Sequence, residues 1–195
     1  GHAKADIDLG RLASMLDPLI EMPELELAGV AVGELQWSAQ PGDLWRLQGD
    51  GNATNLMISL PGGTHLHRPS MAIQVDAAGR WSAGELQELT AAELTLRSES
   101  MEVDTTLVTG VAKPSVDTLW PLRISGRGRL EVLSQFLGPW MPQSLHSLSG
   151  GFAGQTDAVI GLASGEVTSV KLKIDEPRAG WDDRLFAQSQ MTIDF

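Results

Sequence analysis

The sequence predicts a mainly β protein with two short helices, in which a long antiparallel meander of strands forms a curved β-groove. Long stretches alternate apolar and polar residues and are separated by short turns rich in Gly and Pro, as in strands joined in up-and-down order. A short segment with apolar residues at helical spacing occurs twice, each time ahead of such strands. With 195 residues, 42% hydrophobic content and no Cys, the chain is expected to fold without disulfides.

Both helical segments belong to one repeated unit. The run 8–18 returns at 129–139, and the register then continues without a gap. Seven positions are identical in the two copies, against about two expected by chance at ordinary residue frequencies. In the first copy these positions are Leu9, Leu12, Leu16, Pro18, Leu27, Gly29 and Gly33. A repeated helix-plus-strands unit predicts an array, with a first unit at 1–126 and a shorter second unit at 127–195 that continue one sheet without a flexible linker.

The apolar pattern also predicts where the elements lie. The first helix is expected at 7–20 with Asp6 or Asp8 as its N-terminal cap, and the second is expected to start near Gly128. Strands are expected at 25–37, 44–60, 66–76, 84–97, 101–111, 122–125, 145–163, 167–175 and 185–195. Several exceed the usual five or six residues, so they predict a broad sheet with one apolar and one polar face. The pattern does not decide whether this sheet stays open or closes on itself.

Glycines inside the strands are expected to shape the sheet. The apolar phase shifts at Gly29 and Gly33, and a glycine within a strand often marks a bulge that changes the side-chain phase. The run 49–51 is expected to break the second strand, and a turn at 77–79 is expected to end the third.

The charge of the chain limits its partners. A net charge of −11 argues against nucleic acid, whose phosphates need a basic face, and against docking on an anionic membrane surface. No apolar run reaches the roughly 18 residues of a membrane helix. The chain begins with Gly1-His2 instead of Met, so we expect an excised piece of a longer protein. Nothing in the pattern indicates an oligomeric state.

Candidate catalytic and metal-binding residues are isolated in the sequence. His65 and His67 could share a metal on one strand, but no third ligand accompanies them. Asp182-Asp183, or Glu99 with Glu102, could act as paired carboxylates, yet nothing places either pair in a pocket. An enzyme would need convergent titratable groups in a polar pocket. We therefore predict a non-enzymatic protein with no catalytic residues, no metal and no cofactor.

The tryptophans suggest an alternative function. The chain contains six Trp and no Tyr, the tryptophans being Trp37, Trp45, Trp81, Trp120, Trp140 and Trp181. Exposed Trp rings on a flat β surface can stack on sugar rings, so a carbohydrate-binding or adhesive β-module is the competing hypothesis. The same tryptophans could instead have a structural role, in which most of the rings pack in a core or along an apolar trough.

The segment around the first helix resembles a known family. The run 6–16, followed by Pro18, Leu27 and Gly29, looks like the repeat opening of AsmA-like proteins, the group that includes TamB. In that group a short Leu-rich helix introduces a meander of long strands with regularly placed glycines. The second copy at 129–154 is similar.

This resemblance implies a function as well as a fold. AsmA-like proteins are bacterial cell-envelope proteins that are anchored by an N-terminal membrane helix. They form a long, open periplasmic β-groove whose apolar lining is thought to pass phospholipids between the two membranes. The resemblance therefore implies lipid binding or conduction, or a scaffold for outer-membrane biogenesis. It also implies two partners, namely a phospholipid or other lipid and the rest of a larger membrane-anchored chain.

The strand alternation indicates which residues would line such a groove. Lipid chains need a continuous apolar trough, and burial of each CH₂ group contributes roughly 0.8 kcal/mol. The expected lining residues are Leu35, Trp37, Trp45, Leu47, Ile58, Met71, Ile73, Val75, Leu94, Leu96 and Val103.

Overall fold

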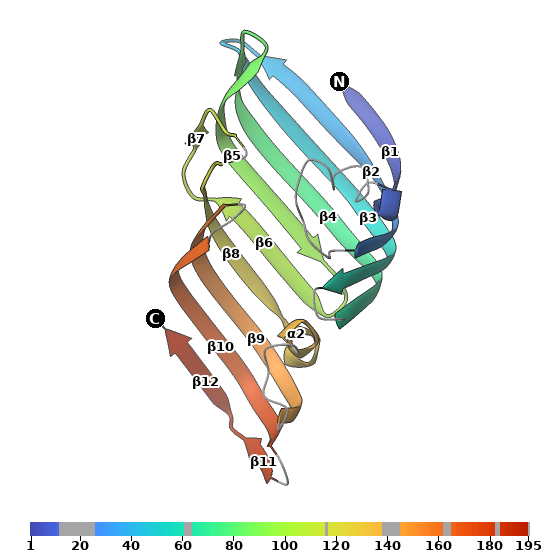
Figure 1. Cartoon of the computed structure of the whole chain (residues 1–195), viewed down its shortest axis with the longest axis vertical. Coiled ribbons are helices and arrows are strands. Elements are labelled where there is room, and N and C mark those ends of the chain that lie inside the picture. The colour runs from blue at the N-terminus through green and yellow to red at the C-terminus, as the bar shows by residue number, and fades with distance from the viewer. Residues whose placement is uncertain are drawn as a thin grey trace.

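The protein is one twelve-stranded antiparallel sheet with helical segments at one side (Figure 1). The computed structural model describes residues 1–11, 26–60, 64–115, 117–137, 145–161, 165–181 and 184–194. The strands are β1 (His2–Asp8), β2 (Glu26–Gln40), β3 (Leu44–Leu60), β4 (Thr64–Ser82), β5 (Glu85–Arg97), β6 (Met101–Leu107), β7 (Val111–Ala112), β8 (Trp120–Arg129), β9 (Leu145–Ile160), β10 (Gly165–Trp181), β11 (Arg184–Ala187) and β12 (Gln190–Asp194). The helix α2 (Leu130–Leu137) joins β8 to β9.

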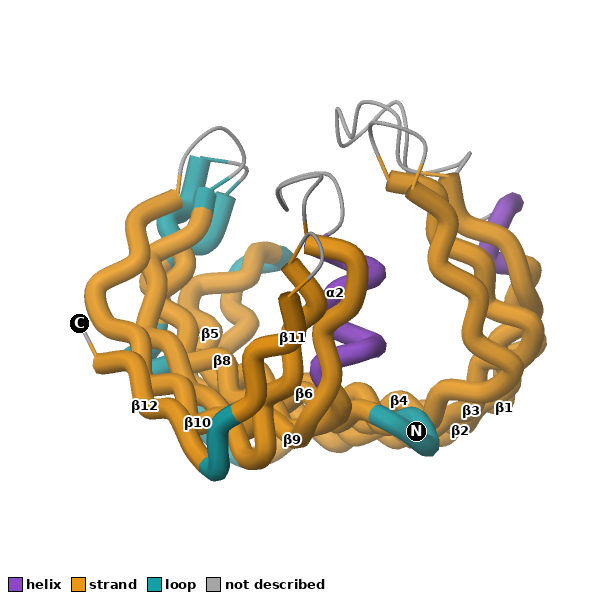
Figure 2. The backbone as a smooth tube through the Cα atoms, turned by 90° about the horizontal axis from the view of Figure 1, so that it is seen from below, coloured by secondary structure: helices purple, strands orange, loops and turns teal. Residues whose placement is uncertain are grey.

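The sheet is a long meander that stays open. Its strand order is β1-β2-β3-β4-β5-β6-β8-β9-β10-β11, with β12 also paired to β10 and β7 to β5. The strands curve strongly, and α2 lies inside the curve (Figure 2). The predicted mainly β fold with two short helices and a curved antiparallel meander is confirmed, and of the two possibilities the sequence left, the sheet is the open one.

The register of the strands separates the residues into two faces. Residues that pair across antiparallel strands point to the same side of a sheet, and neighbours along a strand point to opposite sides. One row across four strands consists of Leu35, Gly49, Val75 and Leu94. The adjacent row consists of Gln36, Gln48, Asp76 and Glu93. One side of the sheet is therefore apolar and the other polar, as the alternation predicts.

Two β-bulges of the same geometry lie in the two halves of the sheet. Gly29 lies in a bulge between β2 and β3, and Gly150 lies in a bulge between β9 and β10. Their φ angles are +131° and +132°, a region open to glycine, and in each case the facing strand also carries a residue at positive φ, Asn55 at 51° and Glu176 at 50°. The same sequence offset relates Gly29 to Gly150 and Asn55 to Glu176.

The strands that precede the two helices also correspond. The last residue of β1, Asp8, pairs with Val30, and the last residue of β8, Arg129, pairs with Gly151 at the same offset. These registers agree with the repeat that the sequence predicts. Most of the first helix, at 12–20, lies outside the described residues, so the repeat of a whole helix-plus-strands unit stays a prediction. So does the division at 126/127, a position that falls inside β8.

Replacement of Gly150 by Ala is expected to destabilise the protein by about 1–3 kcal/mol. The added Cβ would lie 2.8 Å from the carbonyl oxygen of Asp175, and the φ of +132° is one that side chains rarely adopt. Gly151→Ala is the matched control, because a Cβ there meets no atom within 4 Å. Urea unfolding measures both variants, and equal unfolding free energies would contradict the bulge argument.

The N-terminal segment differs from the sequence prediction. Residues 2–8 form the edge strand β1, which pairs with β2 over its whole length, and the sequence prediction did not contain this strand. Helical structure begins at Leu9 instead of Ile7. The backbone N–H of Arg11 donates a hydrogen bond to the Asp8 carboxylate at 3.0 Å, which identifies Asp8 as the cap and not Asp6.

Three predicted interruptions of the strands are wrong. Gly33 pairs in regular register with Ala5 and with Gly51, so no bulge occurs there. The run 49–51 continues β3 without a break, because Gly49 pairs directly with Val75. The run 77–79 lies inside β4, which ends at Ser82. In each case cross-strand hydrogen bonding and packing on both sides override the local preference of glycine for turns.

Candidate ligand-binding face

The predicted lining residues come together on one side of the sheet. The register places ten of them on the apolar side, namely Leu35, Trp37, Trp45, Leu47, Met71, Ile73, Val75, Leu94, Leu96 and Val103. The backbone of Ile58 pairs with that of Leu27 and Leu66, but its side chain lies outside the described residues. We call this side of the sheet the apolar face. That it lines a lipid groove stays a prediction.

The apolar face extends beyond the predicted residues. The row of Ile73, Leu96 and Val103 continues through Gly126 and Gly154 to Leu172 and then Ile193 on β12. Further members on the second half are Leu122, Ile124, Phe152, Ile174 and Met191. Sequence reasoning missed these residues, although their alternation with polar neighbours is the signal that could have identified them.

Most of this face is only partly buried. One cluster of the described hydrophobic core consists of Ala53, Leu56 and Met71, onto which Leu9, Ala31, Ile73 and Leu96 pack, and Leu107, Ala158 and Ile174 are also buried. Away from this cluster Trp37 is 49% exposed and Leu94 is 38% exposed. Extended apolar surfaces of this kind are uncommon on soluble proteins and mark sites of binding. The face therefore differs from an ordinary filled core.

The middle of the face is hollowed. A depression of about 170 Å³ lies over the first strands and is lined by apolar side chains that include Ile7, Leu35, Ile73 and Val75. Its floor contains Gly49, where a Cβ would lie 2.5 Å from Cδ2 of Leu35. A larger residue at this position would collide with the side chains of Leu35 and Val75, which lie over Gly49.

The helix α2 covers one end of the face. It follows β8 directly and contacts β9, β8 and β4. Its Leu130 is 2% exposed and its Val132 is 8% exposed, so both side chains are buried. Since α2 lies inside the curve of the sheet (Figure 2), the apolar residues it buries are on the concave side. The concave side is therefore the apolar one, and the convex side carries the charges.

Cross-strand ion pairs run along the polar face. Arg46 pairs with Asp76, and Arg123 pairs with Asp157 at 2.7 Å. Glu102 accepts hydrogen bonds from two guanidinium groups, those of Arg97 at 2.9 Å and of Arg127 at 2.7 Å. Arg46 and Asp76 are diagonal neighbours and the other pairs are directly opposed. Cross-strand pairs of opposite charge stabilise the pairing of neighbouring strands. Glu102, which the sequence offered as one half of a carboxylate pair with Glu99, is thus part of an ion-pair network.

The pKa of Glu102 gives a prediction about stability. Hydrogen bonds from Arg97 and then Arg127 lower this pKa from 4.5 to about 2. Since the folded pKa is depressed, the stabilisation is complete above pH 4.5 and is lost as the pH falls towards 2. The melting temperature of the wild-type protein should therefore be higher than that of Glu102→Gln at pH 6. The difference between the two melting temperatures should shrink as the pH falls towards 2. Melting followed by circular dichroism measures this difference, and a gap that does not change with pH would contradict the prediction.

Three of the six tryptophans gather at one end of the sheet. Trp37, Trp45 and Trp81 line a cleft of about 850 Å³ beside the turns that join β2 to β3 and β4 to β5. The ring of Trp45 lies on Gly79, and Trp81 is 52% exposed. We call this site the Trp cleft. Trp81 was missed as a partner of the other two, because the sequence placed it beyond the end of its strand.

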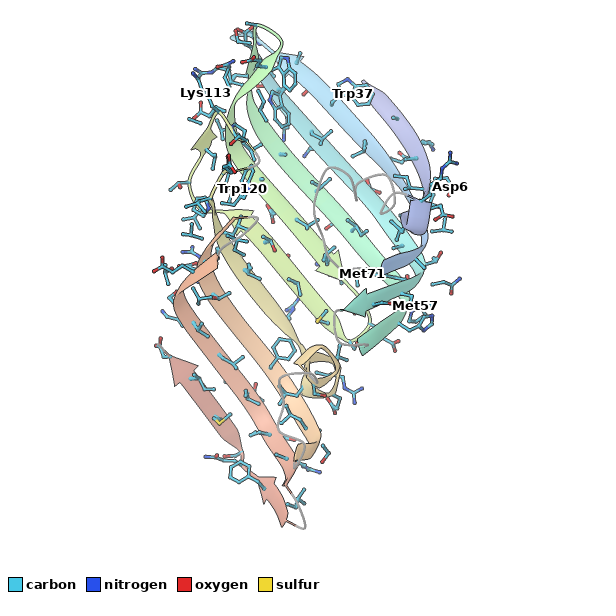
Figure 3. All side chains as sticks on the ribbon, in the orientation of Figure 1. Asp6, Trp37, Met57, Met71, Lys113 and Trp120 are labelled. Atoms are coloured by element: carbon cyan, nitrogen blue, oxygen red, sulfur yellow. The ribbon has the colours of Figure 1, made fainter. Side chains whose placement is uncertain are left out.

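Trp120, the fourth tryptophan with a described side chain, is not among the residues that line this cleft. Trp120 starts β8 and pairs with Ile160, and Figure 3 shows it on a different part of the sheet from Trp37. Trp140 lies outside the described residues, as does the side chain of Trp181. The tryptophans whose side chains are described thus do not form one flat surface of the kind that the carbohydrate hypothesis requires.

In the ranges that the structure describes, no three His, Cys, Asp or Glu residues cluster in a way that could hold a metal ion. The side chain of His65 and the residues 182–183 lie outside these ranges. No helix within the same ranges is long and apolar enough to cross a membrane.

Comparison with known proteins identifies no relative. No protein-family model matches the chain, and no curated protein or solved structure shows significant similarity to it.

Proposed function

We propose that the protein binds the hydrocarbon chain of a lipid along the apolar face. The observation that carries this proposal is the continuity of the face. One apolar row runs from β2 to β12 on the concave side, and its residues are only partly covered. An open sheet of this shape offers a trough instead of a closed pocket, which suits a long and flexible apolar ligand.

The energetics support a lipid chain as ligand. Each CH₂ group removed from water contributes roughly 0.8 kcal/mol, so a chain that covers several strands gains substantial free energy before the cost of ordering it. The trough has few polar groups in its floor, among them Thr105 and Thr156, so it imposes little hydrogen-bond geometry and would accept chains of different length. Movement along the trough would then need no large barrier, which is a requirement for conduction.

The resemblance of the helix–strand segments to AsmA-like proteins supports the same ligand class. On this proposal the chain is a non-enzymatic segment of a periplasmic, membrane-anchored envelope protein. Its partners are a phospholipid or other lipid and the rest of that larger chain. A scaffolding role in outer-membrane biogenesis belongs to the same proposal.

Native mass spectrometry of the gently purified protein tests lipid binding directly. We expect adducts of phospholipid mass that are lost on mild activation. Protein purified without lipid should regain such adducts after incubation with phosphatidylethanolamine and phosphatidylglycerol vesicles. A protein that carries no adduct and takes up neither lipid would refute the proposal.

Carbohydrate binding remains the alternative hypothesis for the tryptophans. Sugar hydroxyls need polar partners, because an unpaired buried hydroxyl costs about 1–3 kcal/mol. Ser38, Gln40 and Asp43 are the polar residues among those that line the cleft, and the alternation of β2 directs the side chains of Ser38 and Gln40 to the side opposite Trp37. The described geometry therefore favours the lipid proposal over this alternative.

A further inference from the structure

The Trp cleft has a composition that the proposed function does not use. Its described lining includes three Trp and three Leu residues, the polar residues Ser38 and Gln40, and Asp43 as the charged residue. No lysine or arginine is among these lining residues. The side chains of Trp37 and Trp81 are each about half exposed, at 49% and 52%, so part of each ring is accessible to a ligand, although Gly1 lies against the ring of Trp37.

Backbone contacts hold Asp43 at the edge of the cleft. The N–H of Trp81 donates a hydrogen bond of 2.8 Å to the backbone carbonyl of Asp43, which ties the β2–β3 turn to the end of β4. Asp43 has a φ of 61°, in the left-handed region, so its place in this turn is defined. Among the described residues no hydrogen bond or ion pair engages its carboxylate. The cleft thus combines aromatic faces with a carboxylate that is available to a ligand.

We propose that the Trp cleft binds an organic ammonium group. Indole faces attract cations through the ring quadrupole, and aromatic residues around a site are the known way in which proteins recognise alkylammonium groups. Asp43 adds a formal negative charge at the rim, and no basic side chain among the lining residues opposes it. The volume of about 850 Å³ is within the range of small-molecule sites, so the group can carry further substituents.

The source of the ammonium group is either a free small cation or the headgroup of an amphiphile. The cleft shares Trp37, Trp45 and Leu47 with the apolar face, so an attached hydrocarbon chain could continue onto that face. This inference does not depend on the proposed lipid function, because a free cation would occupy the cleft alone.

Titration of Trp fluorescence tests the inference with choline as the probe. We expect saturable quenching by choline and none by 3,3-dimethylbutan-1-ol, its neutral isostere. Asp43→Asn should weaken choline binding about two- to fivefold, and Asn keeps the turn because it tolerates positive φ well. Trp81→Ala should abolish saturable binding, whereas Trp120→Phe, a change outside the cleft, should leave the affinity unchanged.

The alternatives give different results. Dodecyltrimethylammonium, used below its critical micelle concentration, distinguishes the two sources of the ammonium group. If it binds more tightly than choline, the ligand is an amphiphile, and if the two affinities are equal, the ligand is a free cation. Equal binding of the neutral isostere, or full affinity in Asp43→Asn, would overturn the inference. So would saturable quenching by cellohexaose with no response to choline. Ile73→Asp, which should impair lipid binding on the apolar face, is expected to leave choline binding intact. The two proposals can therefore fail separately.

Discussion

Ile73→Asp is expected to lower lipid uptake at least tenfold while the sheet stays folded. Ile73 lies in the middle of the apolar face, lines its hollow and is only partly buried. A carboxylate there would lose its hydration under a bound chain, and burial of an unpaired charge costs several kcal/mol. Without ligand the charge remains in contact with water, so the cost to folding is expected to be smaller. Native mass spectrometry after incubation with vesicles measures the uptake.

Gln74→Asp is the matched control for this substitution. It introduces the same charge one position further along β4, where the alternation directs the side chain to the polar face, and Gln74 is exposed. This variant should take up lipid as wild type does. Circular dichroism must show that both variants are folded. If Ile73→Asp unfolds the protein, the face is an ordinary core, and if both variants bind equally, the ligand lies elsewhere.

Leu130→Ala is expected to destabilise the protein by about 2–5 kcal/mol. Leu130 is the first residue of α2 and is 2% exposed, the most buried large side chain that the structure describes. Its truncation would leave a cavity where α2 meets the sheet and loosen the helix on the apolar face. The change in unfolding free energy can be measured by urea titration.

Leu185→Ala supplies the comparison on an exposed site. Leu185 lies in β11 and is 75% exposed, so the same substitution should change stability by less than about 0.5 kcal/mol. A small effect of both substitutions would mean that α2 is not packed on the sheet in solution. Lipid uptake by folded Leu130→Ala would further show whether α2 limits the length of the trough.

The period-two pattern predicted the apolar face well because side-chain direction in a strand is a local property. Once Trp37 and Leu47 are in strands, alternation decides that Leu35 and Trp45 share their side. The pattern could not indicate which strands are neighbours across the second half of the sheet. The residues from Ile124 to Ile193 were therefore missed, although they obey the same alternation.

The glycines show where local reasoning is insufficient. Gly29 and Gly33 have the same signature in the sequence, but only Gly29 occupies a bulge, with a φ of +131°. The difference comes from the facing strand, where Asn55 supplies the extra residue that a bulge requires. Likewise, 77–79 reads as a turn but continues β4, because β3 and β5 pair with it on both sides.

The sequence by itself determined the class of the fold, the lengths of a few strands such as β3 and β5, and the side to which strand residues point, since these follow from local periodicity and turn residues. The tertiary structure decided what depends on the pairing of distant segments. It showed that the sheet stays open and that β1 forms its edge. It also brought Trp81 to Trp37 and Trp45 in one cleft. Such contacts join residues far apart in the chain, and their formation depends on hydrogen bonding between whole strands, which no local pattern encodes.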